Sequence, residues 1–303
     1  MIDFVDQKQA AFVKFNDGVE IPFILPKPSL VIKKSLFAFS LHKAGSSLLT
    51  NLLTEYFQKM KLSCIDLSQF AVRNGYDAVQ IQEGSGSQLL MYQGYGYWGW
   101  RTYASVLDGF DFGKVRSIFL VRDPRDRLVS QYFSFSRSHQ EPESGYASAN
   151  FSLTRKKAQR LLIDNYAIDQ NDWIISNWRA YHEHLDPMTT RVYRYEDVIF
   201  RKVEWLSDIL NFFDLPCDEK IIESIVAQND ILPKNEDPNQ HIRQVRPGNY
   251  KKHLSQGTCE QLNALFFDFL DRYSYLDSQS FGERLVFAEE GSSVSKLFGD
   301  KQV

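Results

Sequence analysis

The chain has 303 residues, of which 43% are apolar and 24% charged, and its formal net charge is −3. This mildly acidic balance excludes a general basic field for nucleic acid. No apolar run reaches the roughly 18 residues of a membrane span, and the first residues show no signal-peptide pattern. The three scattered cysteines form neither a disulfide framework nor a CxxC metal pair. We therefore expect a cytoplasmic protein with one domain over residues 1–303, whose function comes from local sites.

The first part of the chain predicts a hairpin and then a strand–helix–strand unit. Asp17-Gly18 is a strong two-residue turn signal between two alternating runs. The apolar spacing that follows changes from strand-like to helical and back. The expected elements are a hairpin at about 10–25, a buried strand at 35–41, a helix at 46–60 and a strand at 62–67. This order is typical of a parallel sheet.

The rest of the chain continues the α/β pattern. The Gly-, Tyr- and Trp-rich stretch 84–100 has no regular periodicity, and the polar stretch 138–152 has the length of a lid or binding loop. Asp123-Pro124 opens a helix, with Asp as N-cap and Pro in the first turn. Further strands are expected at 117–121 and 191–195, helices at about 153–185, 201–213, 218–229 and 258–272, and a weakly patterned tail after about 280. We predict a P-loop-type, three-layer α/β fold whose mostly parallel sheet is flanked by helices.

The first motif with chemical meaning lies between the first buried strand and its helix. Residues 40–48 read Ser-Leu-His-Lys-Ala-Gly-Ser-Ser-Leu. Gly45 permits a tight turn, the helix N-terminus offers free N–H groups, and Lys43 adds a positive charge, so the loop suits a phosphate. The alternative is a capped helix beside an exposed lysine. The Walker A pattern is absent, because there is one Gly and the Lys precedes it.

The second motif follows the strand at 117–121. Arg122 lies at the carboxyl end of that strand, where open α/β sheets bind ligands. Ser130 follows two helical turns later and could reach the same anion. The alternative is an Arg122 that pairs with Asp126, with Ser130 as a small packing residue.

Together the two motifs resemble those of the sulfotransferase family that uses 3′-phosphoadenosine-5′-phosphosulfate (PAPS). The family carries a Lys-x-Gly-Ser/Thr-Ser/Thr loop for the 5′-phosphosulfate, which matches Lys43 to Ser47, and an Arg-Asp-Pro-x-Asp-x-x-x-Ser-x-Tyr segment for the 3′-phosphate, which matches Arg122 to Tyr132. Residues 193–197, Tyr-Arg-Tyr-Glu-Asp, resemble its Tyr-Glu-Asp strand. Residues 243–251 resemble its late basic segment, with Tyr in place of Trp and Arg-Gln-Val in place of Arg-Lys-Gly. The resemblance covers about residues 35–260.

The resemblance implies a set of site residues. Lys43 is the expected catalytic cation at the leaving phosphate. Tyr195 is expected at the adenine, and Arg243 or its rival Arg246 at the 3′-phosphate. The full set of expected cofactor-binding residues is Lys43, Ala44, Gly45, Ser46, Ser47, Leu48, Arg122, Ser130, Tyr195, Arg243, Arg246 and Gly248. No metal is implied.

The general base is not obvious from the sequence. Many relatives have a His after the strand that precedes the Arg-Asp-Pro motif, but residues 99–102 read Gly-Trp-Arg-Thr here. Glu83, before Gly84-Ser85-Gly86, is the acid best placed on a flexible loop, and Asp66 is the next candidate. His42 favours a structural role. The base role is therefore assigned to Glu83.

The expected function is transfer of a sulfuryl group from PAPS to a hydroxyl or amine of a small molecule, lipid or carbohydrate, with adenosine 3′,5′-bisphosphate as product. Two alternatives stay open: a P-loop kinase-like enzyme, which would need Mg²⁺ ligands, and a non-catalytic nucleotide-binding protein of the same fold. We expect no nucleic-acid partner and no transmembrane segment. A homodimer is left open.

Overall fold

The computed structural model describes residues 10–138, 145–231, 233, 236, 237, 240 and 243–276. The strands are β1 Ala10–Lys14, β2 Glu20–Ile24, β3 Leu36–Ser40, β4 Cys64–Ile65, β5 Gly96–Trp100, β6 Arg116–Val121 and β7 Thr190–Arg194. The helices are α1 Ser46–Lys59, α2 Leu67–Arg73, α3 Pro124–Phe133, α4 Gly145–Arg160, α5 Ile163–Asp169, α6 Asn171–His184, α7 Tyr195–Val198, α8 Lys202–Phe212, α9 Glu219–Asn229, α10 Tyr250–His253, α11 Gln256–Leu265 and α12 Phe267–Arg272. The tail expected after about 280 lies outside the described residues.

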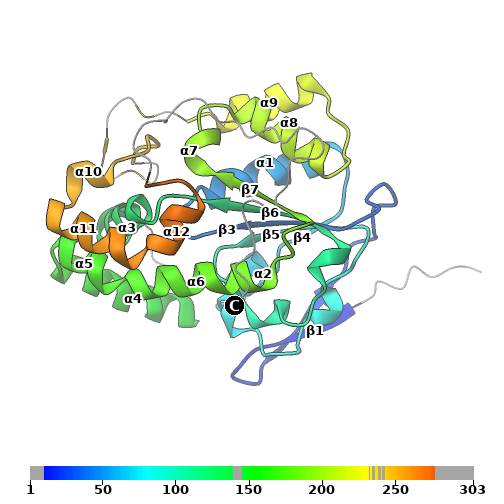
Figure 1. The fold of residues 1–303 in the computed structure, drawn as a ribbon. Coiled ribbons are helices and arrows are strands. Elements are labelled where there is room, and N and C mark those ends of the chain that lie inside the picture. The colour runs from blue at the N-terminus through cyan, green and yellow to red at the C-terminus, as the bar shows by residue number, and fades with distance from the viewer. Residues whose placement is uncertain are drawn as a thin grey trace, which may run out of the picture.

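A five-stranded sheet forms the centre of the fold, in the order β4-β5-β3-β6-β7 (Figure 1). Every pair of neighbouring strands in it is parallel. The expected mostly parallel sheet is therefore confirmed. The expected hairpin is also confirmed, since β1 and β2 pair antiparallel as a separate two-stranded sheet.

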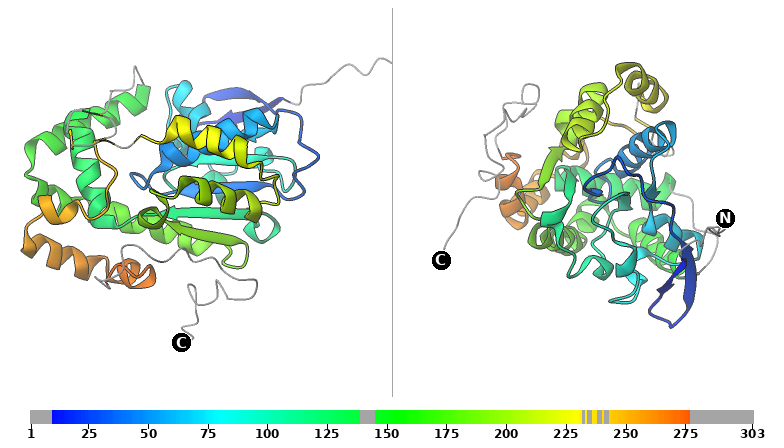
Figure 2. Two further views of the ribbon diagram at one scale, coloured as in Figure 1. Left: turned by 90° about the horizontal axis from the view of Figure 1, so that it is seen from above. Right: turned by 90° about the vertical axis from the view of Figure 1, so that its right-hand side faces the viewer.

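Alternating side chains on the central strands face two different helix layers. On β3, Leu36 and Ala38 pack with α1, α8 and α9, whereas Phe37 and Phe39 pack with α6 on the opposite face. Because successive strand residues point to opposite faces, a strand covered on both sides must be apolar throughout. All five β3 residues are buried accordingly. Figure 2 shows the resulting three layers, which confirm the predicted three-layer α/β fold.

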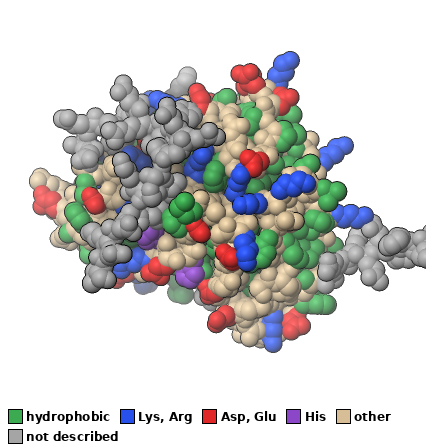
Figure 3. Space-filling view, turned by 45° about the vertical axis from the view of Figure 1, so that its right-hand side comes forward, with side chains coloured by type: hydrophobic (Ala, Val, Ile, Leu, Met, Phe, Trp, Pro, Cys, Tyr) green, Lys and Arg blue, Asp and Glu red, His purple; other side chains and the backbone are tan. Residues whose placement is uncertain are grey.

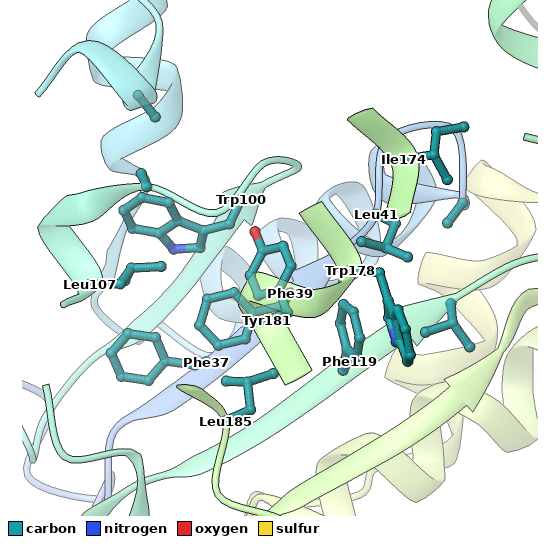
Figure 4. Packing of buried hydrophobic residues seen from close by; sticks show 14 of the residues in the cluster. Phe37, Phe39, Leu41, Trp100, Leu107, Phe119, Ile174, Trp178, Tyr181 and Leu185 are labelled. Atoms are coloured by element: carbon teal, nitrogen blue, oxygen red, sulfur yellow. The ribbon is translucent and has the colours of Figure 1, made fainter. Parts of the chain in front are cut away.

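Large aromatic rings fill the layer between the sheet and α6. Phe39 of β3 and Phe119 of β6 both contact Tyr181 of α6, at ring-centroid distances of 5.3 and 5.2 Å. Figure 4 shows these rings close to Trp178, also from α6. Tyr181 and Phe39 are completely buried. This packing fixes the sheet against α6 and so fixes where the strand ends lie.

Strand β5 lies within the stretch 84–100, for which the sequence predicted no regular structure. Two β3 residues, Phe37 and Phe39, pair with Tyr97 and Trp100, which are three positions apart, so β5 contains a bulge. Gly99 takes up the extra residue with φ of +90°. A side chain at Gly99 would collide with the Asp66 carboxylate. Glycine and aromatic residues, rather than alternating branched ones, make this strand and hid its pattern.

The polar stretch expected as a loop at 138–152 is partly helical. The helix α4 already begins at Gly145, so the loop prediction is wrong from that residue onward. Polar Ser and Asn residues interrupt the apolar stripe of this segment, and this weakens the helical pattern in the sequence. Residues 139–144 of the predicted loop lie outside the described residues, and residues Ser134–Ser138 form a π-helical turn directly after α3.

The expected second strand at 62–67 is shorter than predicted, because only Cys64–Ile65 pair as β4. Asp66 instead caps α2, accepting a hydrogen bond from the Gln69 amide at 2.7 Å. No helix among the described residues is long and apolar enough to cross a membrane.

The packing at the start of β5 predicts a stability difference between two glycines. A Cβ atom at Gly96 would lie 2.5 Å from Trp98 and 2.7 Å from Phe57, both buried, whereas one at Gly257 in α11 would meet nothing within 4 Å. Gly96→Ala should therefore lower the free energy of unfolding by about 1–3 kcal/mol. Gly257→Ala should raise it by about 0.4–1 kcal/mol. Urea denaturation of both variants checks this, and equal stabilities would contradict the packing described.

Candidate functional site

The carboxyl ends of the parallel strands meet at one edge of the sheet, where ligands bind in such folds. A polar or aromatic residue follows each strand of the central sheet at this edge. These residues are Asp66 after β4, Arg101 after β5, Lys43 in the loop after β3, Arg122 after β6 and Tyr195 after β7. A cavity of about 450 Å³ opens at this edge. Its lining includes the β3–α1 loop, the end of β6, α3 and the segment around Arg243.

The loop between β3 and α1 turns sharply through two left-handed residues. Lys43 has φ of +63° and Gly45 φ of +95°. A Cβ atom at Gly45 would lie 2.9 Å from the Tyr195 ring, so only glycine fits there without a shift. The turn places Ser46 and Ser47 in the first turn of α1, and their backbone N–H groups lack helical acceptors. The loop therefore presents N–H donors, hydroxyls and the Lys43 ammonium to one cavity.

The Lys43 ammonium lies among positive neighbours. Its Nζ donates to Ser134 Oγ at 3.0 Å, in the π-helical turn after α3. Burial, and then the charges of Arg101, Arg122 and Arg243, lower the pKa of Lys43 to about 8. A cation held in such surroundings gains most from an anionic ligand.

Arg122 forms the floor beside this loop. Its side chain is only 6% exposed, and its guanidinium stacks 4.4 Å from the centre of the Tyr195 ring. One terminal nitrogen donates to the Lys43 carbonyl at 3.2 Å, and the other lies 3.7 Å from Asp126. Its Nε is buried and makes no hydrogen bond within the described residues. Arg122 thus forms the ion pair with Asp126 that the alternative interpretation expected, and its Nε remains a donor for a ligand.

Arg243 enters the cavity from the other side. Its guanidinium lies 4.5 Å from the centre of the Phe133 ring and donates to Asn249 Oδ1 at 2.8 Å. It also forms an ion pair with Glu236. Burial, and then the charge of Arg122, lower the pKa of Arg243 to about 10.

Asp126 ties this basic segment to α3. Its two carboxylate oxygens accept from the Gly248 amide at 2.7 Å and the Tyr250 amide at 2.8 Å. Asp126 itself is 1% exposed. One buried carboxylate therefore positions both the Arg243 segment and, at longer range, Arg122.

The structure brings most of the predicted site residues to one cavity. The predicted residues that line it are Lys43, Gly45, Ser46, Ser47, Leu48, Arg122, Ser130, Tyr195 and Arg243. Ala44 lies in the core beneath the loop, and Gly248 lies outside the lining. Of the two rival arginines, Arg243 is 8% exposed and lines the cavity, whereas Arg246 is exposed and does not.

Neither predicted acid lies in the cavity lining. Glu83 is exposed, on a loop that packs against the N-terminal hairpin through the Gln82 amide and the Lys14 carbonyl, 2.8 Å apart. Asp66 lies closer to the sheet edge, where burial raises the pKa of its carboxyl and the nearby charge of Arg101 opposes that shift. Glu83 is therefore not part of the lining that contains Lys43, and its role as base stays a prediction.

Several lining residues were not assigned a ligand role from the sequence. Arg101 lies just beyond β5, and His42 directly precedes Lys43. The other unassigned polar residues of the lining are Asn51, Ser134, Lys202, Asn229 and Gln244. Arg101 could have been found from its place after a strand, had β5 been recognised.

The lining suits a ligand with several negative charges. Lys43, Arg101, Arg122, Lys202 and Arg243 all contribute to it, and none of its described residues is Asp or Glu. The Arg122 Nε, which has no hydrogen-bond partner in the described part of the chain, and a lysine with a lowered pKa both gain from an anion. Tyr195 and Leu48 add apolar surface that a flat base could contact. The residues present therefore fit a nucleotide that carries more than one anionic group.

Comparison with known proteins agrees with this chemistry. The family model described as "Sulfotransferase domain" matches residues 102–266, more than half of the chain. The match includes Arg122, Ser130, Tyr195 and Arg243 but not the Lys43 loop. No curated protein sequence gives a significant match to the chain.

Solved structures give weaker likenesses. Mouse sulfotransferase SULT7A1 complexed with PAP is 13% identical, with 86% of this chain and 95% of that chain covered and a TM-score of 0.49. A retinol dehydratase in a complex with retinol and PAP is 14% identical, with 87% and 91% covered and a TM-score of 0.45. A sulfotransferase from Alicyclobacillus acidocaldarius is 16% identical, with 83% and 96% covered and a TM-score of 0.39.

The family assignment rests on the family model alone, whose match begins just after β5 and covers strands β6 and β7 and the late basic segment. The chain belongs to the sulfotransferase domain family.

Proposed function

We propose that this protein transfers the sulfuryl group of PAPS to a hydroxyl or amine of an acceptor and releases adenosine 3′,5′-bisphosphate. The observation that carries the proposal is the convergence of Lys43, Arg122 and Arg243 on one cavity in a protein whose net charge is −3. PAPS has a 5′-phosphosulfate and a 3′-phosphate, which need cations at two separate places. The acceptor is a small molecule, lipid or carbohydrate.

Different parts of the cavity lining would bind the two anionic ends of PAPS. The β3–α1 loop, with Lys43, Ser46 and Ser47, would hold the 5′-phosphosulfate through N–H groups, hydroxyls and one ammonium. Arg122 and Arg243, with Ser130, would hold the 3′-phosphate, because a planar guanidinium matches phosphate oxygens in a fork. Tyr195 would contact the adenine.

Lys43 has the properties required at the leaving group. When bound, PAPS supplies an activated sulfuryl group whose transfer leaves negative charge on the 5′-phosphate. A cation already fixed where that charge develops stabilises the transition state without reorganisation. The hydrogen bond from Lys43 to Ser134 holds the ammonium in place before a ligand arrives.

His42 is the residue of the lining best suited to accept a proton. It precedes Lys43 and faces the rings of Phe135 and Trp173, at centroid distances of 6.0 and 5.8 Å. A neutral imidazole can take a proton from an acceptor hydroxyl at neutral pH. Its place in the lining supports His42 over Glu83 as the base, contrary to the structural role that the sequence favoured.

The proposed function is tested by binding and turnover together. Calorimetry should show binding of adenosine 3′,5′-bisphosphate, with weaker binding of ATP–Mg²⁺, and incubation with PAPS should transfer sulfate to members of an acceptor panel. Tight binding without transfer to any hydroxyl or amine would support a non-catalytic nucleotide-binding protein instead. Preference for ATP–Mg²⁺ would favour the kinase alternative.

Arg243 and Arg246 provide a variant and a matched control for binding of the 3′-phosphate. Arg243→Ala should lower the affinity for adenosine 3′,5′-bisphosphate by tens-fold, because a charge-assisted hydrogen bond contributes about 1.5–3 kcal/mol. It should leave adenosine 5′-phosphate, which lacks the 3′-group, nearly unchanged. Arg246→Ala, an exposed residue outside the lining, should bind both nucleotides like the parent. Calorimetric titration measures the affinities of both variants for both nucleotides. A loss of affinity for adenosine 3′,5′-bisphosphate in Arg246→Ala but not in Arg243→Ala would reverse the assignment.

Replacement of Lys43 should affect rate more than affinity. Lys43→Ala should lower kcat by about 10²–10³-fold, the usual loss when one fixed electrostatic contact to a developing anion is removed. The dissociation constant of adenosine 3′,5′-bisphosphate should change much less, since Arg122 and Arg243 remain. Steady-state kinetics with titration of the same variant checks this, and near-parent turnover would rule out the assigned role.

The same lysine predicts a pH dependence of nucleotide binding. Its pKa of about 8 in the free protein means that the ammonium loses its proton as the pH rises past that value. An anionic ligand favours the charged form, so affinity should fall modestly between about pH 7 and about pH 9, by no more than the change expected for Lys43→Ala. In Lys43→Ala this part of the fall should vanish. An unchanged pH profile in the variant would mean that another group titrates.

The base is identified by comparing three side chains in one assay. His42→Asn should lower kcat by about 10²-fold or more and leave the affinity for adenosine 3′,5′-bisphosphate unchanged. Asp66→Asn and Glu83→Gln are the matched comparisons, and a similar loss in either would move the base role to that carboxylate.

A further inference from the structure

A basic loop between β2 and β3 lies at the opposite edge of the sheet from the cavity. Residues 25–35 lead into the amino end of β3, whereas Lys43 follows its carboxyl end. The loop is the blue turn at the right-hand side of Figure 1, away from α3 and α10. Whatever this loop contacts therefore leaves the cavity accessible.

Hydrogen bonds hold this loop rigidly against the sheet. The Ser29 amide donates to the Gly94 carbonyl at 2.9 Å, and the Gly94 amide donates to the Ile32 carbonyl at 3.0 Å. Ser29 Oγ accepts from the Ser63 amide at 2.8 Å. A Cβ atom at Gly94 would lie 2.5 Å from Pro28, so the loop packs directly on the chain before β5. The tip is thus a fixed structure.

Two aliphatic side chains at the tip point to solvent. Leu30 is 85% exposed and Val31 is 61% exposed, whereas the next residue, Ile32, is 4% exposed and packs in the core. Leu30 is among the most exposed large apolar side chains of the described residues. Exposure of two adjacent aliphatic side chains to water costs free energy. That free energy is recovered only when the side chains pack against an apolar partner.

Lysines are the charged residues of this loop and of the chain that hydrogen-bonds to it. The loop and the chain that hydrogen-bonds to it, residues 25–36 and 59–65, contain no Asp or Glu. Their lysines are Lys27, Lys33, Lys34, Lys59 and Lys61, all exposed. Lys33 also donates to the Leu30 carbonyl at 3.0 Å, which keeps it next to the tip. Figure 3 shows Lys and Arg side chains beside hydrophobic ones along this side, with Asp and Glu side chains among them elsewhere on the same face.

We propose that this loop docks the protein on an anionic lipid surface, with Leu30 and Val31 inserted among the acyl chains and the lysines on the headgroups. An aliphatic insertion and a basic cluster are the two signals that together give stable peripheral binding. Lysine stems can also lie along the apolar boundary while their charges stay at the headgroups. Because the whole chain has a net charge of −3, its attraction to an anionic bilayer would depend on a local basic cluster such as this one.

The chemistry of the tip favours a bilayer over other anionic partners. A single-stranded nucleic acid is held by aromatic stacking and arginine, whereas this tip has aliphatic residues and lysine. Docking at the amino ends of the strands also turns the cavity at their carboxyl ends away from the bilayer, so an acceptor reaches it from water.

Vesicle flotation of the full chain tests the proposal. The protein should float with phosphatidylcholine vesicles that contain phosphatidylglycerol and not with phosphatidylcholine alone, and high salt should release it. Leu30→Ser/Val31→Ser should weaken flotation by about tenfold or more. Lys33→Glu/Lys34→Glu should weaken it by tens-fold, since each lysine near the surface contributes about fivefold.

Matched variants elsewhere control for charge and polarity. Lys156→Glu/Lys220→Glu makes the same charge change on α4 and α9, and Leu153→Ser/Met188→Ser removes two other exposed apolar residues. Both should float like the parent, and circular dichroism verifies that every variant is folded. The proposal fails if the parent does not float with anionic vesicles or if the controls lose as much as the loop variants. Loss in the lysine pair with none in the Leu30/Val31 pair would mean purely electrostatic adsorption, as on an acidic protein, and overturns insertion.

Discussion

The buried carboxylate of Asp126 is the group on which the cation-rich cavity depends. Lys43, Arg101, Arg122 and Arg243 repel one another across the cavity, and the lowered pKa of Lys43 reflects its burial first and then this repulsion. Asp126 offsets part of it near Arg122 and also binds the Gly248 and Tyr250 amides. It thereby holds the segment that carries Arg243 against α3. The remaining positive charge is what an anionic ligand can neutralise.

The extent to which the sequence predicted this site follows from how local each signal is. The turn at Gly45 and the cap at Asp123 depend on neighbours within a few positions, so their patterns are visible along the chain. Likewise, the buried strands β3 and β6 appear as short apolar runs. By contrast, β5 was missed because Gly99 and its bulge break the periodicity, and with it went the significance of Arg101.

Tertiary packing decided the remaining assignments. Arg243 and Arg246 lie three positions apart in similar surroundings along the chain, and only burial beside Phe133 distinguishes them. Glu83 has the loop position expected of a base, but its loop bonds to the hairpin β1–β2 and Glu83 is not part of the cavity lining. No periodicity encodes which loops a sheet edge brings together, because strand order is set by the packing of both helix layers.

The close approach of Gly45 to the Tyr195 ring links two distant parts of the chain into one steric unit. The ring occupies the space that a side chain at position 45 would need, 2.9 Å from its Cβ position. A larger residue at 45 is therefore tolerated only if position 195 has first become smaller, and the left-handed backbone at 45 adds a separate cost. Evolution away from this arrangement has an enforced order of steps, and its first step removes an aromatic face from Arg122. Epistasis of this kind would keep Gly45 and Tyr195 unchanged together, because neither can be replaced first without a cost. This constraint acts in addition to any direct contact with a ligand.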